Sequence, residues 1–283
     1  MSLDKQQCLQ FDAPAFASPS FLWRASFHSG MSADSDLRAA IAEGVPVGVV
    51  ANLLTPTHVI RALPQYLDEG GSVFVDSGAF AAFQKGEQMD WGRVFIAYDC
   101  LVNSTERPDR LSIVAPDVIG DQAATLALWE LHRERICAWV ASGARVIVPL
   151  QRGALSAGDL LGQAKRIFQT DAFCAGIPSN LEAMSADDCA TLHHGDFHIL
   201  GRVKMTPELL AKLQALQSNN PAAVYTADAN WLRSRIRNIS QVKTQRPEFE
   251  RPWYETRRTQ AVRAVLRADA YECGSRLVRA EGR

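Results

Sequence analysis

Three aspartates follow short apolar segments that have the composition of β-strands. Asp76 comes after Val73–Val75, Asp117 after Leu111–Ala115, and Asp228 after Ala222–Tyr225. The carboxyl ends of parallel strands meet at one edge of a sheet, so these side chains are expected to converge. Three carboxylates brought together repel one another unless a cation, a proton or the N–H groups of a ligand compensate them. The pattern predicts a site for a metal ion or for a ligand rich in N–H donors.

Each acid taken singly also has a purely structural explanation. Asp76 is placed to accept a hydrogen bond within the turn at Ser77-Gly78, and the nearby Asp121 is placed to cap a helix. The functional interpretation therefore depends on Asp76, Asp117 and Asp228 pointing toward the same mouth.

Histidine patterns argue against a transition-metal site. No HxH or HExxH arrangement follows a predicted strand, and His193-His194 falls in a helix-to-loop stretch away from the mouth. A hard-cation site built from the three aspartates alone stays open. We expect no resident metal and no cofactor.

The alternative ligand is a guanine-like base. Its N1–H and 2-amino groups present adjacent donors to a carboxylate, and the amide of Gln151 can donate to its O6. The backbone N–H of Gly176 or Ile177 is expected near the same edge, because glycine permits close approach. Phe80 and Leu200 are suited to lie against the two faces of the ring.

Eight candidate strands alternate with longer segments of helical period. They are Phe21–Phe27, Val47–Ala51, Val73–Val75, Leu111–Ala115, Val146–Leu150, Phe173–Gly176, Phe197–Leu200 and Ala222–Tyr225. This alternation is typical of βα units around a parallel sheet. Eight units favour an α/β fold that forms a single (β/α)8 TIM barrel. No GxGxxG follows the first strand, which argues against an open dinucleotide-binding sheet.

We expect the helices and both ends of the chain to belong to one domain over residues 1–283. A helix is expected over Asp121–Ser142, ended by Gly143, and another from Thr206-Pro207-Glu208. Residues 1–19 form a polar leader. Residues 236–283 are expected to be a basic helical extension packed on the barrel, with Val262, Val265 and Leu266 on its apolar side.

Charge is distributed unevenly along the chain. Residues 233–283 carry thirteen Lys/Arg against six Asp/Glu, whereas the whole chain has a net charge of −1. Such a basic end is typical of proteins that contact phosphates, although arginine-rich helices also simply face solvent. The six cysteines are scattered without a CxxC pair, and the longest apolar run, Val45–Leu54, is too short to span a bilayer. We expect a cytoplasmic protein with no membrane partner.

The segment Asp76-Ser77-Gly78-Ala79-Phe80 resembles the DSGGF motif of tRNA-guanine transglycosylases. The order of the later strand ends resembles that family too. Asp117 matches its base-reading aspartate, Gln151-Arg152-Gly153 its Gln-Gly segment, and Gly176-Ile177 its glycine-rich turn. Leu200-Gly201 matches the apolar residue and glycine beneath the base, and Asp228, followed by Arg233 and Arg235, matches the nucleophile ahead of its arginines.

One departure directs the resemblance to a branch of the family. The CxCxxC zinc motif that helps the tRNA enzymes hold tRNA is missing, since Cys273 is the only cysteine after Cys189. Ala81 and Ile119 also differ from the tRNA enzymes near the base. The combination of DSGAF, APDVIGDQ and GIPSN without a zinc motif is similar to the DNA branch, whose members insert 7-deazaguanines, such as 7-cyano-7-deazaguanine, into DNA.

The resemblance implies a mechanism and partners. Asp228 would form a covalent glycosyl-aspartate as guanine leaves, and Asp76 would act as general acid and base. Asp117, Gln151 and Ser77 would bind the base, and Arg233 and Arg235 the nucleic acid. The partners implied are DNA and a free 7-deazaguanine base, and the sequence leaves open whether a helicase or ATPase opens the duplex.

Three other functions remain open from the sequence. The first is a tRNA-guanine transglycosylase, the second a hydrolytic N-glycosidase that delivers water with the same carboxylates, and the third a non-catalytic nucleic-acid-binding barrel.

Overall fold

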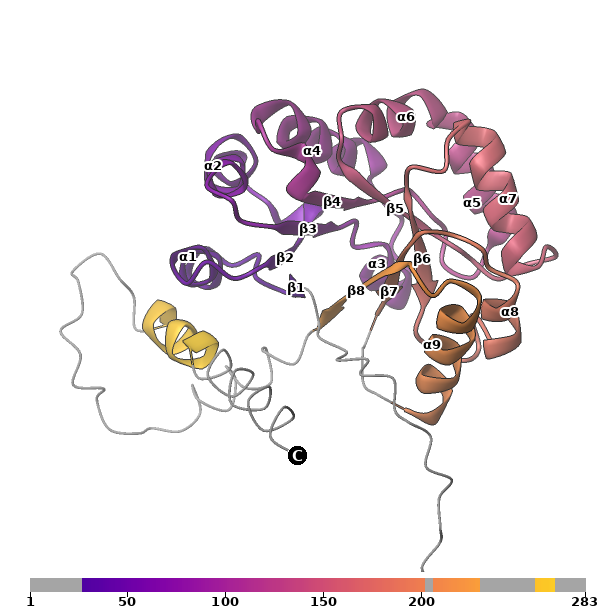
Figure 1. Ribbon diagram of the computed structural model, residues 1–283. Helices are drawn as coiled ribbons and strands as arrows, with labels where there is room; N and C mark the ends of the chain where they lie inside the picture. The colour runs from indigo at the N-terminus through magenta and orange to yellow at the C-terminus, as the bar shows by residue number, and fades with distance from the viewer. Residues whose placement is uncertain (1–26, 202–205, 230–257, 268–283) are drawn as a thin grey trace, which may run out of the picture.

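The fold is a closed barrel of eight parallel strands with helices around it, as expected (Figure 1). The structure is a computed structural model that describes residues 27–201, 206–229 and 258–267. Each strand pairs with the next along the chain, and the last pairs with the first, Phe27 lying opposite Asp228. The described residues therefore form a (β/α)8 TIM barrel.

The strands lie close to their predicted positions, with one shift that matters for the site. They are β1 Phe27–His28, β2 Val47–Val50, β3 Val73–Asp76, β4 Leu111–Val114, β5 Arg145–Pro149, β6 Cys174–Pro178, β7 Asp196–Leu200 and β8 Val224–Ala229. The prediction for the eighth strand ended too early, so Asp228 belongs to β8 itself and not to the loop after it. Residues 21–26 of the predicted first strand lie outside the described residues.

The helices begin largely where the capping residues predict. They are α1 Asp34–Ala42, α2 Leu63–Asp68, α3 Ala79–Lys85, α4 Trp91–Ser104, α5 Gln122–Leu131, α6 Arg133–Ala141, α7 Ala157–Phe168, α8 Ala186–Ala190 and α9 Pro207–Asn219, with short helical turns at Ala51–Leu53, His58–Ala62 and Pro108–Arg110. Asp121 caps α5, and Thr206 caps α9 with Pro207 in its first turn.

The single helix predicted over Asp121–Ser142 is wrong in one respect. It is divided at His132, whose backbone (φ −110°, ψ 16°) leaves the helical region between α5 and α6. Leu126, Trp129, Ile136 and Val140 still belong to one apolar layer on the barrel. Two helices that share a buried face have the same apolar pattern as one continuous helix, so periodicity could not reveal the break.

Alternation along the strands separates the barrel interior from the layer under the helices. Phe27, Phe74, Val114, Ile147 and Cys174 form an inner cluster, against which Leu200 packs. Their neighbours along the strands belong to the outer cluster: Val73, Val75, Ile113, Val146, Val148, Ala175, Ile177, Phe197, Ile199 and Ala227. Successive strand residues point to opposite faces. Asp76, His198, Thr226 and Asp228 therefore lie on the interior face.

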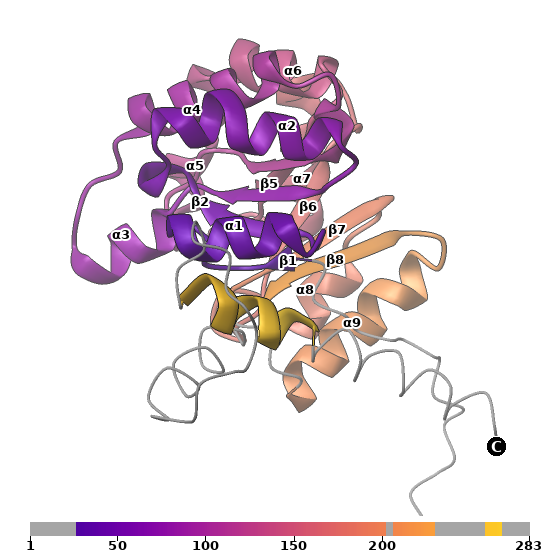
Figure 2. The ribbon, with the colours of Figure 1, turned by 90° about the vertical axis from the view of Figure 1, so that its left-hand side faces the viewer.

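The helix of residues 258–267 packs beside α1 (yellow in Figures 1 and 2). Val262, Val265 and Leu266 are buried in the outer cluster. Arg258 forms an ion pair with Asp36, and both Arg263 and Arg267 do so with Glu43. Three arginines of the basic end thus bind acids of the barrel. No helix within the described ranges is long and apolar enough to cross a bilayer.

Candidate functional site

Asp76 ends β3 and is fixed by the turn that follows it. The N–H of Gly78 donates to Asp76 Oδ1 (3.2 Å), and the N–H of Ala79 donates to Ser77 Oγ (3.2 Å). Gly78 has φ +87°, and a Cβ there would lie 3.0 Å from Val50 Cγ1. Glycine is needed for both reasons. Ser77 is buried at the start of α3, with its hydroxyl accepting that hydrogen bond.

Asp117 and Gln151 form a buried pair across the loops after β4 and β5. Gln151 Nε2 donates to Asp117 Oδ2 (2.7 Å), while the N–H of Gly120 donates to Gln151 Oε1 (2.9 Å). Gln122 links the same loops by donating from Nε2 to the Gln151 carbonyl oxygen (3.0 Å). The amide of Gln151 is therefore oriented from both ends, and one of its two N–H groups is already directed at Asp117.

Asp228 lies on the interior face of β8, where the barrel closes against β1. Ser29, which follows β1, donates from Oγ to Asp228 Oδ2 (2.5 Å). On the other side, His198 Nε2 lies 3.6 Å from Asp228 Oδ1. Each carboxylate oxygen thus faces a different side chain, Ser29 just after β1 and His198 in β7.

The charges of the three aspartates influence one another. Burial and the charge of Asp228 raise the pKa of Asp76 to about 6, although N–H groups of the turn favour its ionised form. Burial and the charge of Asp76 raise the pKa of Asp117 to about 7, against the opposing effect of Gln151. The charge of Asp76 is therefore coupled to the charges of both other acids.

The arrangement does not resemble a metal centre. Among the residues described, no group of three or more His, Cys, Asp or Glu side chains is gathered closely enough to hold one ion. Burial and neighbouring negative charge favour the protonated forms of Asp76 and Asp117. A ligand that brings N–H donors would relieve the same repulsion.

The remaining predicted residues are placed differently from one another. Phe80 lies on α3 with 53 % of its surface exposed, and Leu200 is half-buried above the inner cluster. A Cβ at Gly176 would lie 2.9 Å from Leu200 Cδ1, so this glycine makes room for Leu200. The Ile177 side chain faces the helices, leaving only its backbone on the barrel wall. Arg233 and Arg235 lie outside the described residues.

Sequence reasoning missed Ser29, Thr226 and His198. The signal for His198 was the alternation in β7, where Phe197 and Ile199 face the helices and residue 198 must face inward. It was overlooked because histidines were sought after the strands and not within them.

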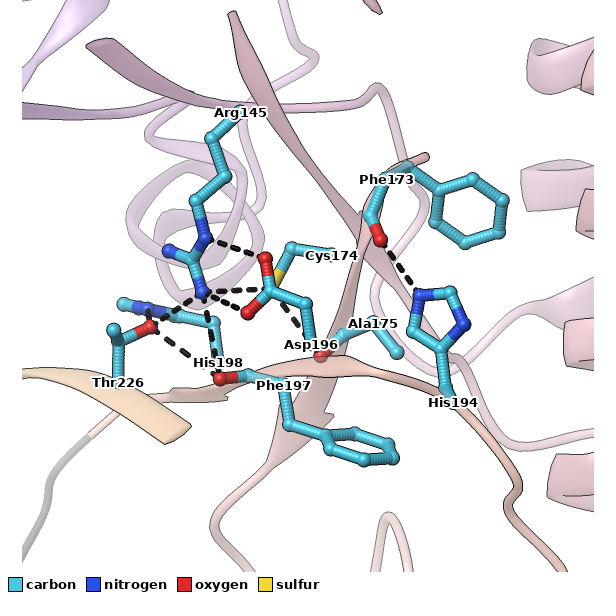
Figure 3. A network of polar contacts seen from close by, with 9 residues as sticks. All are labelled: Arg145, Phe173, Cys174, Ala175, His194, Asp196, Phe197, His198 and Thr226. Atoms are coloured by element: carbon cyan, nitrogen blue, oxygen red, sulfur yellow. Dashed lines mark hydrogen bonds and ion pairs between the residues drawn. The ribbon is translucent and has the colours of Figure 1, made fainter. Parts of the chain in front are cut away.

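A hollow of about 490 Å³ lies at the opposite end of the barrel. Arg145 and Asp196, the first residues of β5 and β7, line it together with His194 (Figure 3). Arg145 donates to both oxygens of Asp196 (2.7 and 2.6 Å), and His194 Nε2 lies 2.6 Å from the Phe173 carbonyl oxygen. Arg145 and Asp196 neutralise one another there, and active sites of such barrels lie at the other end. We therefore place the candidate site at the aspartates.

Comparison with known proteins finds similarities among solved structures alone. No protein-family model matches the chain, and no curated protein matches it. Among solved structures it is similar to a xylose isomerase-like TIM barrel/4-hydroxyphenylpyruvate dioxygenase fusion protein, at 12 % identity over 87 % of this chain and 42 % of that chain (TM-score 0.42). The chain therefore spans less than half the length of that protein.

Two further similar structures come from Coccidioides immitis. One is a putative fructose-1,6-biphosphate aldolase, at 12 % identity over 81 % of this chain and 83 % of that chain (TM-score 0.47). The other is a putative dihydrodipicolinate synthase family protein, at 12 % identity over 71 % and 65 % of the two chains (TM-score 0.42). At these TM-scores the likenesses carry no argument about fold or activity.

Proposed function

We propose that the protein is an enzyme, a transglycosylase that replaces guanine in DNA with a 7-deazaguanine through a glycosyl ester on Asp228. The observation that carries the proposal is the position of Asp76, whose charge interacts with Asp228 on one side and Asp117 on the other. One carboxylate can attack the sugar, the next can move a proton, and the third can read the base.

The first step forms one bond and breaks another. An oxygen of Asp228 attacks C1′ of the deoxyguanosine, the electron pair of the glycosidic bond passes to the base, and Asp76 gives that base a proton. The logic is that of a retaining glycosidase, in which a carboxylate traps an oxocarbenium-like sugar. In the second step the incoming base loses its proton to Asp76 and attacks C1′, which frees Asp228.

The coupling between Asp76 and Asp228 suits this proton transfer. The negative charge of Asp228 is one cause of the raised pKa of Asp76. Ester formation removes that charge, so the proton affinity of Asp76 falls at the moment when the leaving base needs a proton. When the incoming base attacks C1′ and breaks the ester, the charge of Asp228 returns and Asp76 again retains its proton.

The Asp117–Gln151 pair would read the guanine edge. An ionised Asp117 accepts from the N1–H and 2-amino groups, and the second N–H of Gln151 Nε2 remains for O6. Because a stacked base cannot reach a barrel mouth, the nucleotide must be flipped out, which costs a few kcal/mol.

Trapping of the covalent adduct tests the proposal. The protein is incubated with duplex DNA or with tRNA and radiolabelled guanine, and both label exchange and denaturation-resistant adducts are measured. We expect exchange into DNA by the wild type and none by Asp228→Asn. The matched control is Asp121→Asn, because asparagine also caps helices well and Asp121 lies outside the three-aspartate group.

The other outcomes contradict the proposal in distinct ways. Exchange into tRNA alone would assign the nucleic acid to tRNA. Free guanine and abasic sites without label uptake would indicate an N-glycosidase. DNA binding that survives in Asp228→Asn, with no adduct in either protein, would indicate a binding barrel.

A further inference from the structure

A line of polar side chains runs through the barrel from its N-terminal end to Asp228. Arg145 Nη2 donates to Thr226 Oγ1 (2.7 Å), and Thr226 Oγ1 lies 2.8 Å from His198 Nδ1, as Figure 3 shows. The other ring nitrogen of His198 faces Asp228 Oδ1 at 3.6 Å. The line therefore joins the ion pair of Arg145 with Asp196 to the carboxylate at the mouth.

The donors in this line can be assigned from chemistry. Arg145 can only donate, so the Thr226 oxygen accepts from it. His198 is fully buried, and burial lowers its pKa although Asp228 favours the charged form, so the ring is neutral and carries one N–H. A proton on Nδ1 would leave the lone pair of Nε2 facing a carboxylate oxygen. The proton therefore belongs on Nε2. The Thr226 hydroxyl has two acceptors within reach, His198 Nδ1 (2.8 Å) and the Phe197 carbonyl oxygen (3.3 Å), and we assign its proton to the nearer one, Nδ1.

The surroundings hold the ring of His198 in this orientation. It stacks on Phe74, with centroids 4.9 Å apart and planes at 25°. Within the described residues Nε2 has no hydrogen-bond partner, and Asp228 Oδ1 lies just beyond hydrogen-bond distance. A small movement of Asp228 toward the ring would satisfy a buried N–H that is otherwise costly to leave unpaired.

We propose that His198 is a positioning residue for Asp228, fixed in its Nε2–H tautomer by Thr226 and Arg145. Ser29 holds one carboxylate oxygen and His198 directs the other, so the plane of the carboxylate is set from both sides. The catalytic consequence rests on the proposed role of Asp228 as nucleophile. The tautomer of His198 and its cause do not depend on that role.

Nitrogen-15 NMR of the histidine rings tests the tautomer without reference to activity. The signals of His198 are assigned by their loss in His198→Phe, in which the stacked ring is kept. We expect a neutral ring with the proton on Nε2 in the wild type and in Thr226→Ser, which retains the hydroxyl. Thr226→Val should shift the His198 signals toward a mixture of tautomers. A wild-type ring protonated on Nδ1, or on both nitrogens at neutral pH, would overturn the inference.

Kinetics of adduct formation test the positioning role. We expect Thr226→Val and His198→Phe to lower kcat roughly 10- to 100-fold, the range for loss of a hydrogen bond to a charged group, with KM changed less than about 2-fold. Thr226→Ser should recover most of the rate. Tyr225→Phe, an outward-facing neighbour on β8, is the matched control with wild-type kinetics.

Two kinetic results would refute the positioning role. One is an equal loss in Thr226→Ser and Thr226→Val, and the other is a change in KM alone. If the wild type showed no base exchange, the proposed function would fail, while the NMR result would still decide the tautomer.

Discussion

The two ends of the barrel interior handle buried charge in opposite ways. At the N-terminal end, Arg145 meets Asp196 through two hydrogen bonds and also binds Thr226, so a cation balances the acid. At the C-terminal mouth, the charge of Asp76 interacts with those of Asp117 and Asp228, and none of the three forms an ion pair with a lysine or arginine among the described residues.

This difference separates charges that serve the fold from charges that serve a site. Paired charges gain nothing from a ligand, whereas unbalanced acids are held together at a free-energy cost that a ligand or a proton can relieve. Raised pKa values at one end and a satisfied ion pair at the other are what such a division predicts. Substitutions at one end remove the balance of charge, and substitutions at the other remove the repulsion.

The largest effect is expected from Arg145→Met, which leaves Asp196 without its cation. Side-chain exposures of 19 % and 28 % place this pair largely inside the protein. Breaking such a pair costs about 3 kcal/mol in the free energy of unfolding, because one charge stays buried and uncompensated. Urea unfolding of Arg145→Met, Asp196→Asn and the double variant measures this. The double variant should be more stable than Arg145→Met, and equal destabilisation of the two would contradict the compensation.

At the mouth, Asp117→Asn is expected to change stability in the opposite direction to Arg145→Met. The pKa of Asp117 is about 7 in the folded protein against 3.8 when unfolded. At pH values between these two pKa values, the folded state binds one more proton than the unfolded state. The wild type therefore loses stability as the pH rises from about 4 to about 7. The loss is on the order of 3 kcal/mol. Asp117→Asn should flatten this decline and be more stable than wild type at pH 8.

Unfolding measured from pH 4 to pH 8 checks that sign. Asparagine can still accept from Gln151, so the loop contact is retained. Asp121→Asn serves as the control with a wild-type profile. A wild type whose stability rises over this range would show that Asp117 is not held among repelling charges.

The sequence predicted the barrel and the acids of its mouth for a clear physical reason. The apolar outward faces of the strands and the capping residues of the helices are local signals, and a polar residue directly after a strand needs no knowledge of its neighbours. Asp76 and Asp117 were placed in this way. Asp228 was expected after the eighth strand but lies within β8, near its end. Either position puts it at the C-terminal end of the barrel, so the sequence still placed it at the mouth.

The polar line inside the barrel could not be predicted in this way. Arg145 and Thr226 are 81 residues apart, and Ser29 and Asp228 are 199 apart. Such contacts depend on strand register and barrel closure, which a single sequence does not contain. The basic end shows the same limit, because its charge pattern suggested phosphate binding while Arg258, Arg263 and Arg267 bind acids of α1 and Glu43 just after it.

A more local perturbation of the mouth is expected from Gly48→Ala. A Cβ at this position of β2 would lie 2.8 Å from Ser29 Cα and 3.1 Å from Ser29 Oγ, so Ser29 must shift, which disturbs its hydrogen bond to Asp228. We expect adduct formation to slow roughly 10- to 100-fold, as for loss of a hydrogen bond to a charged group. Ser29→Ala should have the same effect. In the double variant the losses should not add, and additive losses would show that Gly48 acts by another route.

The smallest effect is expected from Glu43→Gln, because this acid near the surface is balanced by Arg263 and Arg267. Burial by itself would raise the pKa of Glu43, but hydrogen bonds from Arg267 and Arg263 lower it overall. Because the pKa of Glu43 is lower in the folded protein than in the unfolded chain, the ionised carboxylate stabilises the fold at pH values above the unfolded-state pKa. This contribution is lost as the pH falls through the folded-state pKa. The variant should lose about 1 kcal/mol at pH 7 and less at pH 3, because exposed partners and salt weaken the pair. Thermal unfolding at both pH values checks this, and an equal loss at the two would mean that Glu43 acts through packing and not through its charge.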